Sequence, residues 1–320
     1  MGRSFSLRDG RGLPAFSLLT LGWMVLVILE GAVVRATSSG GGCGNHWPLC
    51  NGDFVPHHPR LATIIEYTHR SMTGICVMLT VAMIAWVFQA KPKLHPARRA
   101  AVWSGVLLIT EGALGAVLVK GGYVEGNTST ARVIVQCIHF TNTMLLVAAM
   151  ALTWWWARQA SESPLPSAND ISLRGVSWTA LVATMVTGAT GSVAALADTL
   201  FPSPSLRAGL AADFDPNSPL LIHMRWMHPA VALVSVVCVV WLAVRLRSTA
   251  TRWLISLAVL QMVLGVVDVL TLAPITMQVL HLLGADFYWI ALVVASGDAL
   301  QRARSRVFAQ AASTGHQGAY

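Results

Sequence analysis

Long runs of apolar residues, separated by short polar and basic segments, form the main pattern along this chain. Each run is close to the roughly 20 residues that cross a bilayer as an α-helix. The boundary between the last two runs is the least marked, because only Leu272 to Ile275 separates them. The pattern predicts an all-α polytopic membrane protein with eight spans, at 13–34, 61–89, 100–119, 133–157, 175–197, 219–244, 252–271 and 274–296.

The composition agrees with this pattern. Of the 320 residues, 55% are hydrophobic and only 11% are charged, which excludes an ordinary soluble domain. The first span follows the N-terminal segment without a cleavage site of the A-x-A type, so we expect it to be retained. No long Arg- and Ser-rich presequence precedes it, which favours a bacterial plasma membrane over a mitochondrion.

The net charge of +8 reflects topology rather than nucleic-acid binding, because the basic residues gather in alternate connections. Basic residues collect on the cytoplasmic side of membrane proteins. Both termini are therefore expected in the cytoplasm, and loops 35–60 and 197–219 on the outer side. The residues that carry this prediction are Arg3, Arg8, Arg11, Lys91, Lys93, Arg98, Arg99, Arg158, Arg174, Arg245, Arg247, Arg252, Arg302, Arg304 and Arg306.

The chain also repeats itself. Spans two and six, three and seven, and four and eight share short motifs, and spans one and five share a Gly-Ala step. The pattern predicts two four-helix halves, 1–160 and 170–320, that insert the same way up about a pseudo-two-fold axis along the membrane normal. The matched pairs are "EYTHRSMTGICVMLTVAMIAW" with "RWMHPAVALVSVVCVVW", Leu114–Val117 with Leu264–Val267, Gln136-x-x-His139 with Gln278-x-x-His281, and Gly31-Ala32 with Gly188-Ala189.

Each half places one histidine near the outer end of its second helix and one near the outer end of its fourth. A lone intramembrane histidine is more often a packing residue, but that does not explain equivalent pairs in both halves. Two imidazoles on facing helices can hold a haem iron. The repeat thus predicts two haem sites, His69 with His139 and His228 with His281. His223 lies five residues before His228, off its helical face.

One half carries an extra acid. Glu66 lies three residues before His69 on the same helical face, whereas its counterpart in the second half is Arg225. This difference suggests that the first half performs chemistry and the second carries electrons. The alternative is that Glu66 is a helix-start acid favoured by the helix dipole. The other acids in or near spans remain rival proton carriers: Glu30, Glu111, Asp268 and Asp286.

The first outer loop contains Cys43 and Cys50. On an oxidising side of the membrane they would form a disulfide or a redox-active pair. A zinc site shared with His46, His57 or His58 is the alternative.

In their order along the chain, the cysteine loop, Glu-x-x-His-Arg in span two, the Leu-Gly steps and both Gln-x-x-His motifs resemble the haem A synthase family. These bacterial membrane enzymes are related to mitochondrial cytochrome oxidase assembly factors. The resemblance implies oxidation of the C8 methyl of haem O to the formyl group of haem A. It also implies haem O on His69 and His139, a haem b cofactor on His228 and His281, an essential Glu66 and a Cys43–Cys50 disulfide.

The chain departs from the family where His228 is followed by Pro229 instead of arginine. An arginine partner for a haem b propionate is therefore in doubt, and Arg225 is the candidate substitute. The implied partners are the bilayer, a farnesyltransferase that makes haem O, cytochrome oxidase assembly factors and an electron acceptor. No nucleic acid is expected.

An iron with two histidine ligands has no open position for O2. We therefore expect electrons and protons to be removed from the methyl group, with water supplying the oxygen and Glu66 taking a proton. Two other classes stay open at this stage. One is a dihaem electron carrier such as a quinol or ferric reductase, and the other is a transporter or assembly scaffold that binds no haem.

Overall fold

The computed structural model describes residues 10–159, 170–246 and 249–317. Arg3, Arg8 and Arg247 of the topology prediction lie outside them. In this part of the chain the structure is all-helical without strands, and eight helical spans are long and apolar enough to cross a membrane. The prediction of eight spans is therefore confirmed. The long helices are α1 (Leu13–Ala36), α2 (Leu61–Ala90), α3 (Pro96–Lys120), α4 (Thr130–Arg158), α5 (Asp170–Leu200), α8 (Met227–Leu246), α9 (Thr249–Leu270) and α10 (Ile275–Gln317).

The connection between α9 and α10 does separate two spans. Leu272 and Ala273 adopt left-handed backbone conformations, with φ of 65° and 51°. Such residues end helices, and the following Pro274 cannot continue one. A four-residue stretch of sequence is therefore enough to reverse the chain.

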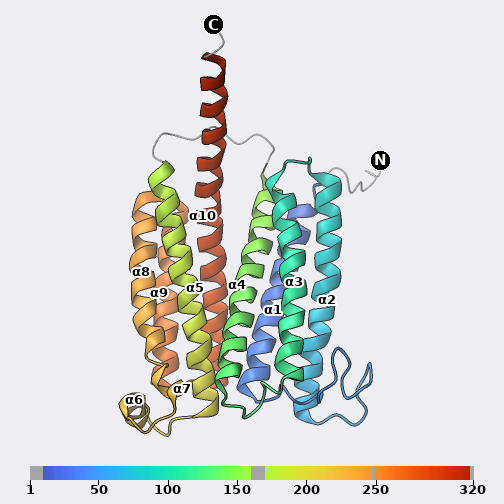
Figure 1. Ribbon diagram of the computed structural model, residues 1–320, viewed down its shortest axis with the longest axis vertical. Helices are drawn as coiled ribbons and strands as arrows, with labels where there is room; N and C mark the ends of the chain where they lie inside the picture. Colours follow the sequence, from blue (N-terminus) through green and yellow to red (C-terminus); the bar gives the residue numbers. More distant parts are fainter. Residues whose placement is uncertain (1–9, 160–169, 247–248, 318–320) are drawn as a thin grey trace.

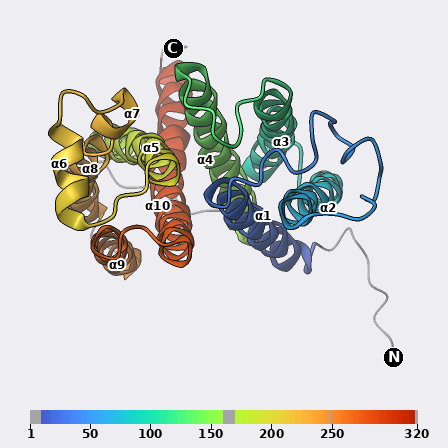
Figure 2. The same cartoon turned by 90° about the horizontal axis from the view of Figure 1, so that it is seen from below.

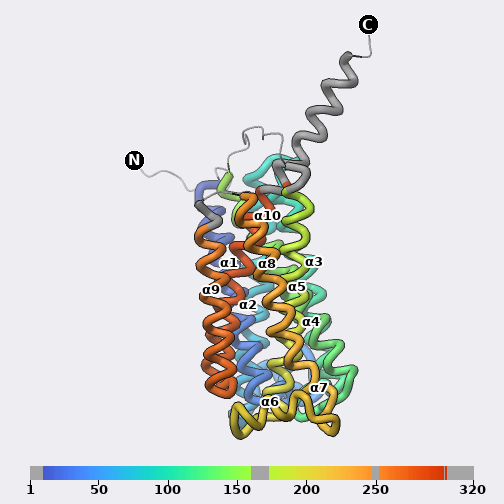
Figure 3. The backbone as a smooth tube through the Cα atoms, turned by 90° about the vertical axis from the view of Figure 1, so that its left-hand side faces the viewer, coloured from blue at the N-terminus to red at the C-terminus, as the bar shows by residue number. Residues whose placement is uncertain are grey.

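Two short helices were not predicted as separate elements: α6 (Leu206–Phe214) in the expected loop 197–219, and α7 (Leu220–His223), which is separated from the rest of the predicted span 219–244. They lie at the lower end of the bundle in Figure 1, and Figure 3 shows α6 across that end. Ser205 begins α6 by accepting a hydrogen bond from the Ala208 amide at 3.2 Å. We call this end of the bundle, with the connections 37–60, 121–129, 201–219 and 271–274, the loop end.

The helices form two groups, α1–α4 and α5–α10 (Figure 1). Viewed along the bundle, α1, α4, α5 and α10 meet in the centre, with α2 and α3 on one side and α8 and α9 on the other (Figure 2). The apolar core continues from one group into the other, and the Trp289 indole of α10 donates to the Met144 carbonyl of α4 at 2.8 Å. Outward side chains are apolar, such as Ile109, Val237 and Trp253. The arrangement is that of a multi-pass membrane protein.

Candidate functional site

A cavity of about 1270 Å³ lies between the helices and reaches the loop end. Ordinary small-molecule pockets are roughly 300–1,000 Å³, so this cavity is larger than most of them. Residues of both helix groups line it. The structure brings all four histidines predicted as ligands to this cavity: His69, His139, His228 and His281.

The histidines are arranged in two pairs. The ring centres of His228 and His281 are 6.3 Å apart, with the rings at 83° to each other. Two nitrogens at about 2 Å from one metal ion would put two facing rings about this far apart. His69 and His139 are close enough for their charges to interact. The donor set of both pairs, and the spacing of His228 and His281, fit an iron porphyrin held between two imidazoles.

Glycines on neighbouring helices leave the space that three of these imidazole rings occupy. A Cβ on Gly31 would lie 3.0 Å from Cε1 of His69, and one on Gly191 would lie 2.9 Å from Cε1 of His228. Gly265 stands in the same relation to His281, at 3.0 Å. The glycine beside His228 is thus Gly191, three residues beyond the Gly188 of the sequence pairing. The geometry aligns α1 with α5 by a shift of 160 residues (191 − 31), which a shared Gly-Ala step did not reveal.

A backbone carbonyl orients the ring of His228. Nδ1 of His228 lies 3.1 Å from the Thr187 carbonyl oxygen, so it carries the proton and leaves Nε2 for a metal. Val27, related to Thr187 by the same shift of 160, has its carbonyl near His69, but Nδ1 of His69 makes no hydrogen bond among the described residues. The equivalent placement of the two carbonyls supports equivalent roles for the two histidines.

Glu66 is buried and lines the cavity, three residues before His69. Its Oε1 accepts from Nη2 of Arg70 at 2.5 Å and from Nε at 3.1 Å. Its Oε2 accepts from the Cys43 amide at 2.7 Å. The Cys43 contact is more than a helix-start acid requires, because it ties the carboxylate to a loop that is distant in sequence.

That loop is closed by a disulfide between Cys43 and Cys50. Arg70 holds it against α2 by donating to the carbonyl oxygens of His46 and Leu49, both at 2.6 Å. Both cysteines are used in the disulfide, so the alternative zinc site lacks its thiolates. Within the described residues no group of three or more potential ligands is gathered for a metal ion. The loop is instead part of the wall beside Glu66.

Arg225 forms ion pairs with acidic side chains, so its charge is already neutralised within the protein. It donates to Oδ1 of Asp213 at 2.6 Å and to Oδ1 of Asp198 at 3.1 Å. These bonds fasten α6 to α5 and weaken the idea that Arg225 replaces the arginine missing at Pro229. His223 also binds this region, through Nδ1 at 2.8 Å from the Asp213 carbonyl oxygen. Its structural role fits the preference for His228 as the ligand.

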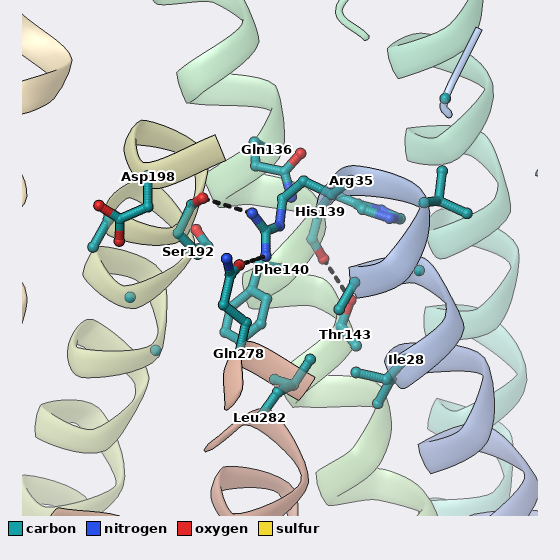
Figure 4. Close-up of a pocket in the computed structure, with 18 of the residues that line it drawn as sticks. Ile28, Arg35, Gln136, His139, Phe140, Thr143, Ser192, Asp198, Gln278 and Leu282 are labelled. Atoms are coloured by element: carbon teal, nitrogen blue, oxygen red, sulfur yellow. Dashed lines mark hydrogen bonds between the residues drawn. The ribbon is translucent and has the colours of Figure 1, made fainter. Parts of the chain in front are cut away.

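Arg35 was missed in the sequence. Figure 4 shows its side chain reaching from α1 toward Gln278 of α10. It donates to Oε1 of Gln278 at 2.7 Å, to the Ala195 carbonyl at 2.6 Å and to Oγ1 of Thr199 at 2.5 Å. An arginine at the end of the first apolar run looks like a flanking residue, so the sequence offered no signal for this bridge between the helix groups.

Two third-helix residues were also overlooked as ligand neighbours. Oε1 of Glu111 on α3 lies 3.5 Å from Nδ1 of His139, and Nε2 of Gln261 on α9 lies 3.1 Å from Nδ1 of His281. The sequence shows that the two residues are equivalent, because Glu111 and Gln261 occupy the same place in "EGALGAVLV" and "QMVLGVVDVL", but it does not show which helix they face. Of the rival acids, Asp268 lines the cavity, whereas Glu30 lies outside its lining in the described part of the chain.

Comparison with known proteins gives a consistent set of relatives. Residues 14–293 match COX15-CtaA, described as cytochrome oxidase assembly protein. A protoheme IX farnesyltransferase of Thermus thermophilus is 40% identical over 308 residues, which are 92% of this chain and 50% of that protein. A heme A synthase of Geobacillus kaustophilus is 34% identical over 142 residues, 44% of this chain and 42% of the relative. One of Exiguobacterium sibiricum is 28% identical over 182 residues, 57% and 59% of the two chains. The chain spans about half the length of these relatives.

Proposed function

Because the chain belongs to the COX15-CtaA family of cytochrome oxidase assembly proteins, we propose that it is a membrane enzyme of haem A biosynthesis that oxidises the C8 methyl of haem O to a formyl group. The observation that carries this proposal is the meeting of four histidines, in two pairs, in one cavity of about 1270 Å³. The dihaem electron carrier and the transporter gain no support from the comparisons.

The two halves have different tasks in this proposal. Residues 1–160 hold haem O through His69 and His139, and residues 170–320 hold haem b through His228 and His281. Glu66 supports the assignment, because the second half has Arg225 at that place and Arg225 is bound to two aspartates. When bound, haem b supplies a one-electron carrier beside the substrate.

Glu66 acts as the proton acceptor. Removing two electrons and one proton from the methyl group leaves a cationic carbon, which water attacks to give an alcohol and a second proton. A second round and loss of water give the formyl group, so four electrons pass to an acceptor outside the chain. Two donors, Arg70 and the Cys43 amide, hold the carboxylate in place. A fixed negative charge next to a developing positive charge lowers the barrier.

We place the enzyme in a bacterial plasma membrane with the loop end outside. The basic connections and the disulfide loop lie at opposite ends of the bundle, which supports this orientation. A protoheme farnesyltransferase is the proposed source of haem O. The Thermus relative with that name, half of which this chain matches, supports the pairing. Cytochrome oxidase assembly factors are the proposed recipients of haem A.

The oxygen source tests the reaction. The chain is co-expressed with a haem O source under ¹⁸O2, and the extracted haems are separated by chromatography and analysed by mass spectrometry. We expect haem A and the hydroxymethyl intermediate, both without label, because water supplies the oxygen. The alcohol is the decisive species, since a formyl oxygen exchanges with water. A labelled alcohol would exclude the water route, and haem b without any oxidised haem would exclude the enzyme itself.

The glycine contacts give a second prediction. Gly31→Ala should push the His69 ring aside and weaken haem binding in the first half by roughly 10-fold, because a carbon at 3.0 Å is closer than the usual 3.5–4.0 Å or so. Gly22→Ala on the same helix is the matched control, since its Cβ would meet nothing within 4 Å among the described residues. Haem titration of the purified proteins measures both. Equal affinities would mean that Gly31 does not position the ring.

A further inference from the structure

The third helix of each half brings one polar side chain to the fourth-helix histidine. In the first half it is the carboxylate of Glu111, and in the second it is the amide of Gln261. The two residues are related by the same shift of 150 that relates Gly115 to Gly265 (265 − 115). The halves thus share this contact and differ in its charge.

Glu111 is held rigidly. Its Oε2 accepts from Nδ2 of Asn142 at 2.6 Å, and its Oε1 accepts from the Thr143 hydroxyl. Asn142 is itself fixed, since its Oδ1 accepts from Thr110 at 2.8 Å. The carboxylate is therefore buried and aimed, and Nδ1 of His139 is buried 3.5 Å from it without a hydrogen-bond partner among the described residues. A contraction of a few tenths of an ångström would give a hydrogen bond of ordinary length.

Gln261 presents the opposite polarity. Its Nε2 donates to the His281 carbonyl oxygen at 3.0 Å and faces both nitrogens of the same ring, Nδ1 at 3.1 Å and Nε2 at 3.2 Å. The amide fits because Gly284 leaves room, as a Cβ there would come within 2.6 Å of Oε1 of Gln261. The counterpart of Gly284 is Asn142, which holds Glu111 instead (284 − 142 equals 281 − 139). The fourth helix of each half therefore carries the residue that accommodates the polar side chain of the third helix: Asn142 for Glu111 and Gly284 for Gln261.

We propose that Glu111 is a positioning residue that fixes His139 with Nδ1 protonated and lowers the reduction potential of the iron in the first half relative to the second. The inference rests on the proposed function. A carboxylate that accepts from Nδ1–H directs Nε2 toward the metal and makes the imidazole a stronger electron donor. A neutral amide with its N–H toward the ring does not. The electron-rich iron then lies where the substrate is oxidised, and electrons run toward the second half.

The test is a spectroelectrochemical titration of the purified, haem-loaded protein. Wild type should show two transitions, and Glu111→Gln should raise the lower midpoint potential and leave the higher one in place. Gln261→Glu should lower the higher one, and Glu111→Asp should recover part of the wild-type value. We also expect roughly 10-fold weaker haem binding in the first half of Glu111→Gln. Glu30→Gln removes a carboxylate outside the cavity lining and is the matched control.

A Glu111→Gln protein with both haems and unchanged potentials would overturn the inference and leave the proposed function intact. If that variant loses haem from both sites, Gln261→Glu decides alone, and an unchanged higher potential overturns the inference. A wild type that binds no haem contradicts the proposed function, which separates the two failures.

Discussion

Glu66→Gln should lower the rate of haem A formation at least about 100-fold, while both haem sites stay filled. Glutamine keeps an oxygen for the Cys43 amide but loses the negative charge and the ability to take a proton. Haem O should therefore accumulate in the first half. Chromatography of extracted haems, with the haem-to-protein ratio beside it, measures both effects.

The ion pair with Arg70 has to be separated from the chemistry in that experiment. Arg70→Gln removes the same pair but keeps the carboxylate, so it should retain part of the activity. If the two variants lost activity equally, Glu66 would act through the disulfide loop that Arg70 holds. A Glu66→Gln protein that forms haem A at the wild-type rate would exclude Glu66 as the proton acceptor.

Removing one ligand histidine from either half should abolish haem binding in that half alone. We expect His139→Ala to retain about one haem per chain in place of two, haem b, with no oxidised product. His281→Ala should retain haem O in the first half and also fail to oxidise it, because the electron carrier is missing. An iron that loses one of two strong ligands is bound far more weakly.

His223→Ala is the matched control for this pair, because His223 lies outside the cavity lining of the described residues and binds Asp213. It should keep both haems and the activity. Identical haem content in His139→Ala and wild type would mean that the first pair is not a haem site.

Much of the architecture could be predicted because the bilayer demands apolar runs of fixed length, and even the short break at Leu272 was readable. That the four histidines and Glu66 share one region could be predicted for a related reason, since polar side chains stand out in an apolar background. Helix rotation was not readable. Whether Glu111 faces His139 or a neighbouring helix depends on how α3 and α4 pack. The pattern of apolar residues along the chain does not determine that packing. The same holds for Gly191 against Gly188.

Arg35 has a consequence for how such a chain could have arisen. With the shift of 160, its counterpart in the second half is Ala195, the residue whose carbonyl it binds. A homodimer of two first halves would bring two arginines together across one buried axis, where like charges repel strongly. A homodimer of two second halves would have alanine at both places and no cation to bridge them. If the two halves derive from one duplicated ancestor, this bridge requires that they diverged here into a cation donor and its acceptors, so that neither can replace the other.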